Sequence, residues 1–129
     1  MDIKRARIVV VEDENLMSTF ILNSLRRMGI LDLYAFKDGA TALREVVALK
    51  PDLIITDVHM EPVGGVEFVR ELRRHPNSQI GNTKVIFLSA DARAATVSEA
   101  LPLGIVGYIV KPPSLTALAN KIELALKNL

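Results

Sequence analysis

The feature that most constrains the fold of this chain is the alternation of short β-branched runs with longer stretches of helical spacing. The strongest runs lie at residues 8–11, 53–56 and 84–88, and weaker ones lie at residues 31–36 and 107–110. Runs that are apolar at every position suit strands covered on both faces, as in a parallel sheet. The pattern therefore predicts five buried parallel strands.

Between the runs, apolar residues recur every three or four positions, which is typical of amphipathic helices. The first stripe consists of Leu16, Phe20, Ile21, Leu25 and Met28. Similar stripes occur within residues 42–49, 66–72 and 115–126, and residues 92–101 form a weaker, alanine-rich stretch that predicts a short helix. Five strand–helix repeats predict an α/β domain with right-handed crossovers.

Length and composition predict one independently folding domain over residues 1–129. Half of the residues are hydrophobic, 24% are charged and none is cysteine. The first apolar stretch stops at Glu12 and Asp13, so it is too short for a signal-peptide core or a membrane span. These features favour a cytoplasmic protein that does not enter a membrane.

The charge pattern gives no indication of nucleic-acid binding. The formal net charge is only +1, and acidic residues are interspersed with the basic pairs Arg26-Arg27 and Arg73-Arg74. Only 5% of residues are aromatic, so stacking platforms for bases are also scarce. We therefore expect no direct contact between this domain and nucleic acid.

Polar residues collect where the predicted strands end. Glu12 and Asp13 follow the first run, Asp57 follows the third, Ser89 follows the fourth, and Lys111 follows the fifth. Ligands of open parallel α/β sheets bind beyond the carboxyl ends of the strands, which share one edge. We therefore expect three carboxylates, a hydroxyl and an ammonium to meet there.

These residue types suit phosphoryl chemistry. Clustered carboxylates repel one another unless a cation joins them, and hard oxygen ligands select Mg²⁺ or a similar ion. A carboxylate can act as a nucleophile and become an acyl phosphate, while a lysine and a serine can hold phosphoryl oxygens. Each residue alone has an ordinary explanation, as a helix cap, a turn or a surface group. Their conjunction at the ends of successive strands favours a phosphoryl-transfer site.

Four segments carry a family resemblance, in this order: residues 9–14 (VVVEDE), 51–60 (PDLIITDVHM), 85–90 (VIFLSA) and 107–112 (GYIVKP). Together they resemble the receiver domain of two-component response regulators, over essentially the whole chain. The resemblance implies a flavodoxin-like, doubly wound fold with strand order 2-1-3-4-5 and five flanking helices.

The resemblance also implies roles for individual residues. Asp57 corresponds to the phosphoacceptor, and Lys111 corresponds to the lysine that binds the phosphoryl group. Asp13 corresponds to a direct Mg²⁺ ligand, and Glu12 to one that acts directly or through water. At the position of His59 the family uses a backbone carbonyl as metal ligand, so the imidazole itself is not expected to bind the ion.

Further positions concern signalling and lifetime. Ser89 and Tyr108 correspond to the switch pair, in which the hydroxyl and the ring move inward on phosphorylation. The bond between Lys111 and Pro112 is commonly cis in the family. His59 and Asp91 lie two residues beyond Asp57 and Ser89, and we hypothesise that they tune the lifetime of the phosphoryl group.

One departure from the family pattern follows the phosphoacceptor position. The family often has a methionine-proline pair there, whereas here Met60 is followed by Glu61 and then Pro62. The loop length to Gly65 is retained. We therefore expect the carbonyl at His59 to keep its place.

The function implied is that of a signalling receiver and not of an enzyme, apart from self-catalysed phosphoryl transfer and autodephosphorylation. The phosphoryl group would come from a histidine kinase or a phosphotransfer protein. The output would be a protein target or a fused output domain, reached through the face made by the fourth helix, the fifth strand and the fifth helix. Leu101, Leu103, Ile105 and Val106 would leave apolar surface there, through which a homodimer could form.

Three alternative functions fit the sequence less well. A haloacid-dehalogenase-like phosphatase also uses a strand-end aspartate and Mg²⁺, but it needs a second aspartate where this chain has His59, and it needs a cap segment. A flavin-binding module of the same fold would need a phosphate-cradling loop where this chain has Glu12-Asp13-Glu14-Asn15, whose acids would repel the phosphate. A scaffold without phosphorylation conflicts with the presence of the acceptor, the acids and the lysine.

Overall fold

The computed structural model describes residues 2–91 and 93–127 and contains one five-stranded sheet. All pairings are parallel and the order is β2-β1-β3-β4-β5, as predicted. The strands are β1 (Arg7–Val11), β2 (Asp32–Phe36), β3 (Leu53–Asp57), β4 (Lys84–Ser89) and β5 (Gly107–Val110). Asp57 and Ser89 are thus the last residues of their strands, one position further inside than the sequence pattern suggested.

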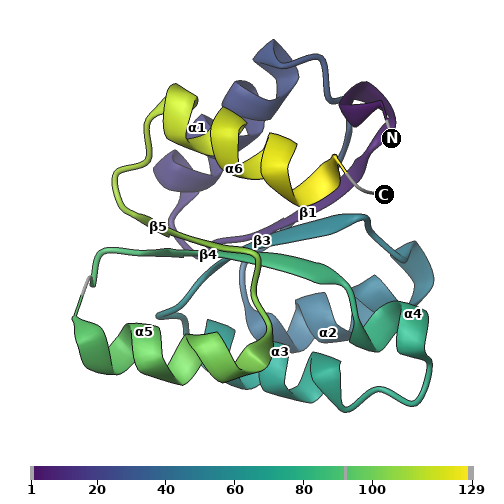
Figure 1. Cartoon of the computed structure of the whole chain (residues 1–129), viewed down its shortest axis with the longest axis vertical. Coiled ribbons are helices and arrows are strands. Elements are labelled where there is room, and N and C mark those ends of the chain that lie inside the picture. Colours follow the sequence, from purple (N-terminus) through teal and green to yellow (C-terminus); the bar gives the residue numbers. More distant parts are fainter. Residues whose placement is uncertain (1, 92, 128–129) are drawn as a thin grey trace.

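Helices cover both faces of the sheet (Figure 1). α1 (Asn15–Arg27) and α6 (Leu115–Leu126) lie on one face, and α2 (Gly39–Leu49), α3 (Gly65–Arg73), α4 (Ser78–Gly81) and α5 (Ala94–Ala100) lie on the other. Short 3₁₀ turns occupy η1 (Ile3–Arg5) and η2 (Leu101–Leu103). The helices therefore cover both faces of the sheet, as in a doubly wound fold.

The prediction of five helices was wrong by one. α4 is a single turn of four residues, capped by the Asn77 side chain, and it is too short to show apolar periodicity. The predicted helix at residues 92–101 exists as α5 and continues directly into η2; Ala92 itself lies outside the described residues.

Each apolar strand supplies two cores, because successive side chains point to opposite faces. Ile8 and Val10 join a cluster with Leu25 and Ile122 beneath α1 and α6. Val9 and Val11 join a second cluster beneath the helices of the other face, which is centred on Phe68, Val69, Leu72 and Phe87. Burial on both faces explains why the runs are continuously apolar.

One part of the first predicted stripe was wrong. Leu16 is 82% exposed and Phe20 is 43% exposed, because α1 turns Ile21, Ser24 and Leu25 toward the sheet. Apolar spacing alone does not say which of two adjacent stripes faces the core.

Gly65 fixes the loop that follows Asp57. Its N–H donates to the Val58 carbonyl at 2.8 Å, and a Cβ at this position would lie 2.1 Å from the Asp57 carbonyl oxygen. The helix start therefore packs directly against the backbone of the strand end. Only glycine allows this approach without displacing Asp57.

We expect Gly65→Ala to lower the free energy of unfolding by about 2 kcal/mol, the size of overpacking effects. The matched control is Gly104→Asn, since Gly104 has a φ of +68° that Asn tolerates and open space around its Cβ position. Urea denaturation of both variants checks this. Equal stability of the two variants would contradict the close approach at Gly65.

Candidate functional site

The carboxyl edge of the sheet brings the predicted acids together. Glu12 and Asp13 follow β1, and Asp57 ends β3. One carboxylate oxygen from each lies within 4.8 Å of the others. Glu12 and Asp57 are buried, whereas Asp13 is exposed, so the cluster meets solvent at Asp13.

Backbone hydrogen bonds continue the parallel ladder past the strand ends. Glu12 N–H donates to the Phe36 carbonyl at 3.0 Å, and Val58 N–H donates to the Leu88 carbonyl at 3.0 Å. Lys111 N–H donates to the Ser89 carbonyl at 2.8 Å. The residues just beyond the strands are therefore held in the frame of the sheet, which fixes the backbone from which Glu12 and Lys111 reach the site.

Lys111 supplies the positive charge inside this cluster. Its Nζ lies 2.5 Å from Glu12 Oε1 and 3.2 Å from Asp57 Oδ2, and its side chain is only 14% exposed. The peptide bond that it makes with Pro112 is cis, as the family resemblance implied, and the Glu61–Pro62 bond is cis as well. The lysine predicted from sequence therefore contacts two of the three predicted acids.

The buried site shifts the pKa of both partners. Burial raises the pKa of Glu12 and repulsion from Asp57 adds to this, although the ammonium of Lys111 and the Glu14 N–H act in the opposite sense. Burial alone would lower the pKa of Lys111, but hydrogen bonding and charge from Glu12 and Asp57 outweigh it and raise that pKa. The net effect keeps Lys111 protonated and makes ionised Glu12 costly.

The cluster fits a hard divalent cation. Its donor set consists of oxygen alone, which suits Mg²⁺. Glu12 Oε1 is buried and, apart from its ion pair with Lys111, has no hydrogen-bond partner among the described residues. An additional cation would satisfy this oxygen and reduce the repulsion among the carboxylates.

His59 lies at the mouth of the site, in the turn after β3. A hollow of about 300 Å³ is lined there by Asp13, His59, Glu61 and neighbouring loop residues. The imidazole of His59 is 61% exposed, and its Nε2 lies 3.9 Å from Asp91 Oδ2. The structure thus places the side chain at the solvent side and brings together the two residues of the lifetime hypothesis.

Ser89 and Tyr108 are linked through one residue. Ser89 is fully buried, and its Oγ accepts a hydrogen bond from Asp91 N–H at 2.9 Å. The Tyr108 hydroxyl donates to the Asp91 carbonyl at 2.7 Å, and its half-buried ring meets Phe87 edge-on at 6.4 Å. The sequence identified both hydroxyls but gave no sign that Asp91 joins them.

Arg93 was not predicted as part of the site. Its guanidinium grips the Asp91 carboxylate, with Nε 2.9 Å from both oxygens and Nη2 2.7 Å from Oδ2. This hydrogen bonding raises the pKa of Arg93 further above its usual value. The sequence signal for this contact was the position of Arg93, two residues after Asp91.

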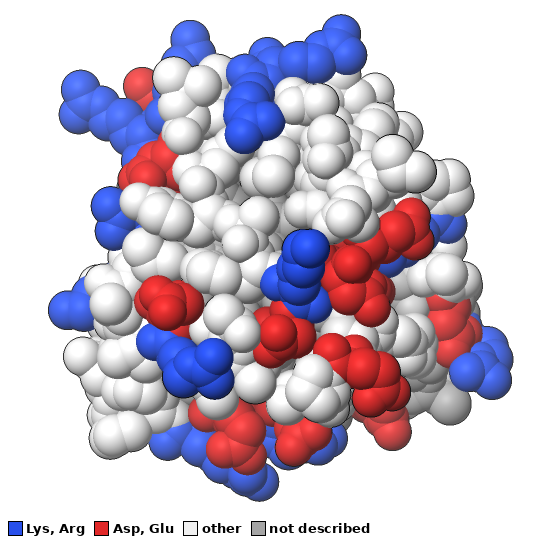
Figure 2. Space-filling view, turned by 180° about the vertical axis from the view of Figure 1, so that it is seen from behind, with Lys and Arg blue, Asp and Glu red and all other residues white. Residues whose placement is uncertain are grey.

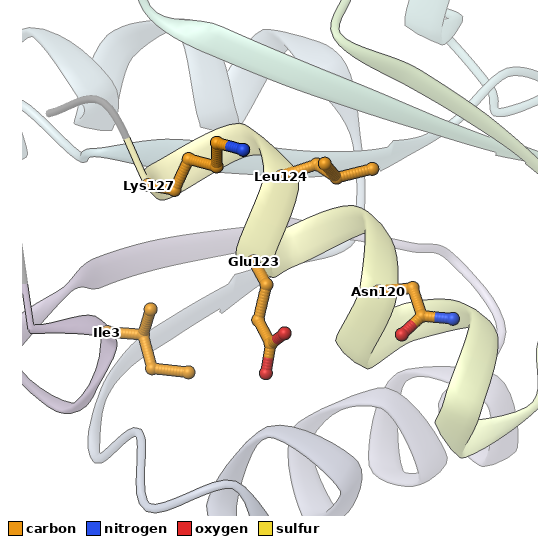
Figure 3. Close-up of a pocket in the computed structure, with 5 residues that line it drawn as sticks. All are labelled: Ile3, Asn120, Glu123, Leu124 and Lys127. Atoms are coloured by element: carbon orange, nitrogen blue, oxygen red, sulfur yellow. The ribbon is translucent and has the colours of Figure 1, made fainter.

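A larger hollow, of about 740 Å³, lies away from this edge, between η1 and α6 (Figure 3). It is lined by Ile3, Asn120, Glu123, Leu124 and Lys127. A single carboxylate and a single ammonium stand among these residues, so it lacks the convergence of charges found at the carboxyl edge. The volume of a hollow therefore does not by itself identify the functional site.

Charged side chains of both signs lie on the surface. On the face shown in Figure 2, acidic side chains lie mostly in the lower half, and basic side chains lie among them and also along the upper edge. Within the described residues, no helix has both the length and the apolar character needed to cross a membrane.

Comparison with known proteins gives consistent matches. Residues 8–123 match the family model of the response regulator receiver domain. The chain is 31% identical to the chemotaxis protein CheY of Pseudomonas aeruginosa over 91% of this chain and 93% of that protein. It is 33% identical to a protein-glutamate methylesterase/protein-glutamine glutaminase of Desulfotalea psychrophila, but it spans only 33% of that relative's length.

A solved structure agrees with these matches. The chemotaxis response regulator CheY4 of Vibrio cholerae superposes with a TM-score of 0.85 at 26% identity, covering 95% of this chain and 99% of that one. Close to the full length of that structure is thus shared with this chain.

We expect Lys111→Met to lower the free energy of unfolding at neutral pH by roughly 3 kcal/mol, because it leaves two buried carboxylates without their cation. The pKa of Glu12 lies above its ordinary value of 4.5. Its ionised form therefore costs stability above that raised pKa, and the cost fades as pH falls through it. The destabilisation should accordingly shrink in acid.

Denaturation at several pH values, without divalent ions, measures this loss. Lys84→Met at the opposite end of β4 serves as the control and should show no such pH dependence. A pH-independent loss in Lys111→Met would contradict the role assigned to the ion pairs.

Proposed function

Because this chain belongs to the response regulator receiver domain family, we propose that Asp57 is the residue that accepts the phosphoryl group. The observation that carries the proposal is the convergence of Glu12, Asp13 and Lys111 on that carboxylate at the end of β3. The family match lends no support to the dehalogenase-type phosphatase. The family assignment indicates a role in signalling. That this chain itself catalyses phosphoryl transfer to Asp57 is part of the proposal.

The transfer step follows from the geometry of the side chains. One carboxylate oxygen of Asp57 forms a bond to phosphorus while the P–N bond of a phosphohistidine donor breaks, and the electron pair of that bond stays on the imidazole nitrogen, which takes up a proton. Lys111 lies 3.2 Å from Asp57 Oδ2, within reach of the phosphoryl oxygens, and offsets their charge. Ser89 can donate its hydroxyl hydrogen to one of them.

Mg²⁺ is the cofactor that the donor set supports. Glu12 and Asp13, Asp57 itself and the carbonyl of His59 would hold it, and the ion would neutralise charge on the phosphoryl oxygens as transfer proceeds. The buried Glu12 oxygen supports this ligand set.

The partners follow from the same role. We propose that a histidine kinase or a phosphotransfer protein donates the phosphoryl group, and that a protein target or a fused output domain responds. The responding face is formed by α5, β5 and α6, where Leu101 is 63% exposed and Val106 40% exposed. Leu103 and Ile105, by contrast, are partly buried against the core, which narrows the apolar surface offered to a homodimer.

After incubation with acetyl phosphate and Mg²⁺, intact-mass analysis should reveal one phosphoryl adduct on the natural chain. Asp57→Asn should abolish the adduct, because the amide cannot act as the nucleophile. Asp52→Asn, at the opposite edge of the sheet, should retain it. An adduct that persists in Asp57→Asn would sink the assignment, and its absence from the natural chain would do the same.

Loss of the phosphoryl group should depend on His59 and Asp91. In that reaction a water oxygen bonds to phosphorus as the bond to Asp57 breaks, which restores the carboxylate and releases inorganic phosphate. The two side chains lie 3.9 Å apart on the solvent side of the site, where water enters.

We expect His59→Gln combined with Asp91→Asn to change the autodephosphorylation rate several-fold, followed as the decay of the adduct by mass. The control is His75→Gln, beyond the end of α3. An unchanged decay in the double variant would remove both residues from the mechanism.

A further inference from the structure

Asp91 connects the two hydroxyl groups of the proposed switch pair. Its N–H donates to Ser89 Oγ at 2.9 Å, and its carbonyl accepts the Tyr108 hydroxyl at 2.7 Å. One residue therefore joins a buried hydroxyl at the end of β4 to a half-buried ring on β5. A displacement of Asp91 alters both hydrogen bonds at once.

The position of Asp91 is in turn held through its side chain. Arg93 contacts both carboxylate oxygens through its guanidinium, and its backbone N–H donates to Oδ1 at 2.9 Å. The Asp91 side chain is 14% exposed and that of Arg93 is 80% exposed. A mostly buried carboxylate is thus gripped from the solvent side by a planar fork, a geometry that a lysine cannot reproduce.

We propose that Arg93 is a positioning residue for the switch. By gripping the Asp91 side chain, it holds the Asp91 carbonyl where that carbonyl accepts the Tyr108 hydroxyl, and so it favours the ring position packed against Phe87 before any phosphoryl transfer. The inference rests on the proposed function for the meaning of the Tyr108 position, but the contact network itself exists without phosphorylation.

The contact between Arg93 and Asp91 is expected to shift the equilibrium between the two Tyr108 ring positions, but it is too weak to fix one of them. Exposed ion pairs are weak, and this pair gains from its fork geometry and from the burial of one partner. A two-state surface responds to a small free-energy difference, because ligands only shift populations that already exist. We therefore expect loss of the grip to change the ratio of the two ring positions by about two- to fivefold.

The test follows the Tyr108 ring directly. The chain has two tyrosines, so 3-fluorotyrosine labelling in a Tyr34→Phe background reports on Tyr108 alone by ¹⁹F NMR. Spectra are recorded without Mg²⁺ and without a phosphodonor for the parent, Arg93→Gln and Arg93→Lys. Arg93→Gln should move the signal toward the solvent-exposed ring, and Arg93→Lys should restore only part of the parent signal.

Two further variants separate positioning from general loosening. Arg74→Gln breaks an exposed arginine–carboxylate pair with Glu71 on α3, at 2.6 Å, and should leave the Tyr108 signal unchanged. In an Asp91→Ala background, Arg93→Gln should add no further shift, since the two residues act as one unit. Thermal midpoints confirm that each variant is folded.

Three results would overturn the inference: a parent-like signal in Arg93→Gln, an equal shift in Arg74→Gln, or an undiminished Arg93 effect without the Asp91 carboxylate. None of these spectra involves phosphorylation. A chain that accepts phosphate on Asp57 while Tyr108 ignores Arg93 would therefore refute this inference alone. Conversely, an Arg93-dependent ring in a chain that accepts no phosphate would refute only the proposed function.

Discussion

The ammonium of Lys111, set between Glu12 and Asp57, is the interaction on which the rest of the site depends. Two buried carboxylates at the end of a hydrophobic sheet would be prohibitive without a nearby positive charge. The lysine supplies that charge from β5, the edge strand, while the acids come from β1 and β3. The site therefore exists only when the central strands and the edge strand are assembled.

The charges of the site do not balance, and the excess of negative charge favours the binding of a cation. One ammonium lies near three carboxylates, and the pKa of Glu12 is raised, mainly by burial and further by repulsion from Asp57. A cation and a phosphoryl group bring opposite charges to the same place, so each makes the other's binding more favourable. A site whose charges already cancelled would bind the cation and the phosphoryl group less favourably.

The proposed signal readout uses a second, separate set of contacts. Asp91 N–H donates to Ser89 Oγ at the end of β4, and the Asp91 carbonyl accepts the hydroxyl of Tyr108 on β5. Because both bonds involve Asp91, a shift of this residue would alter the contact with Tyr108 on β5, a strand of the proposed responding face. This is the kind of coupling expected of a two-state element biased by charge.

Much of this could be predicted from sequence, because continuous apolar runs identify parallel strands and the edge that their ends share. That reasoning predicted Glu12, Asp13, Asp57, Ser89 and Lys111 at one edge, and the structure brings the three acids and the lysine together. It could not choose which stripe of α1 is buried, because apolar spacing fits two adjacent stripes. It also missed α4, because a single turn is too short to show periodicity. The contacts of Asp91 with Ser89 and Arg93 are local, since each spans two positions. The link from Asp91 to Tyr108 was decided by tertiary structure alone, because it depends on how β4 and β5 lie side by side, and no spacing along the chain encodes a contact between residues 17 positions apart.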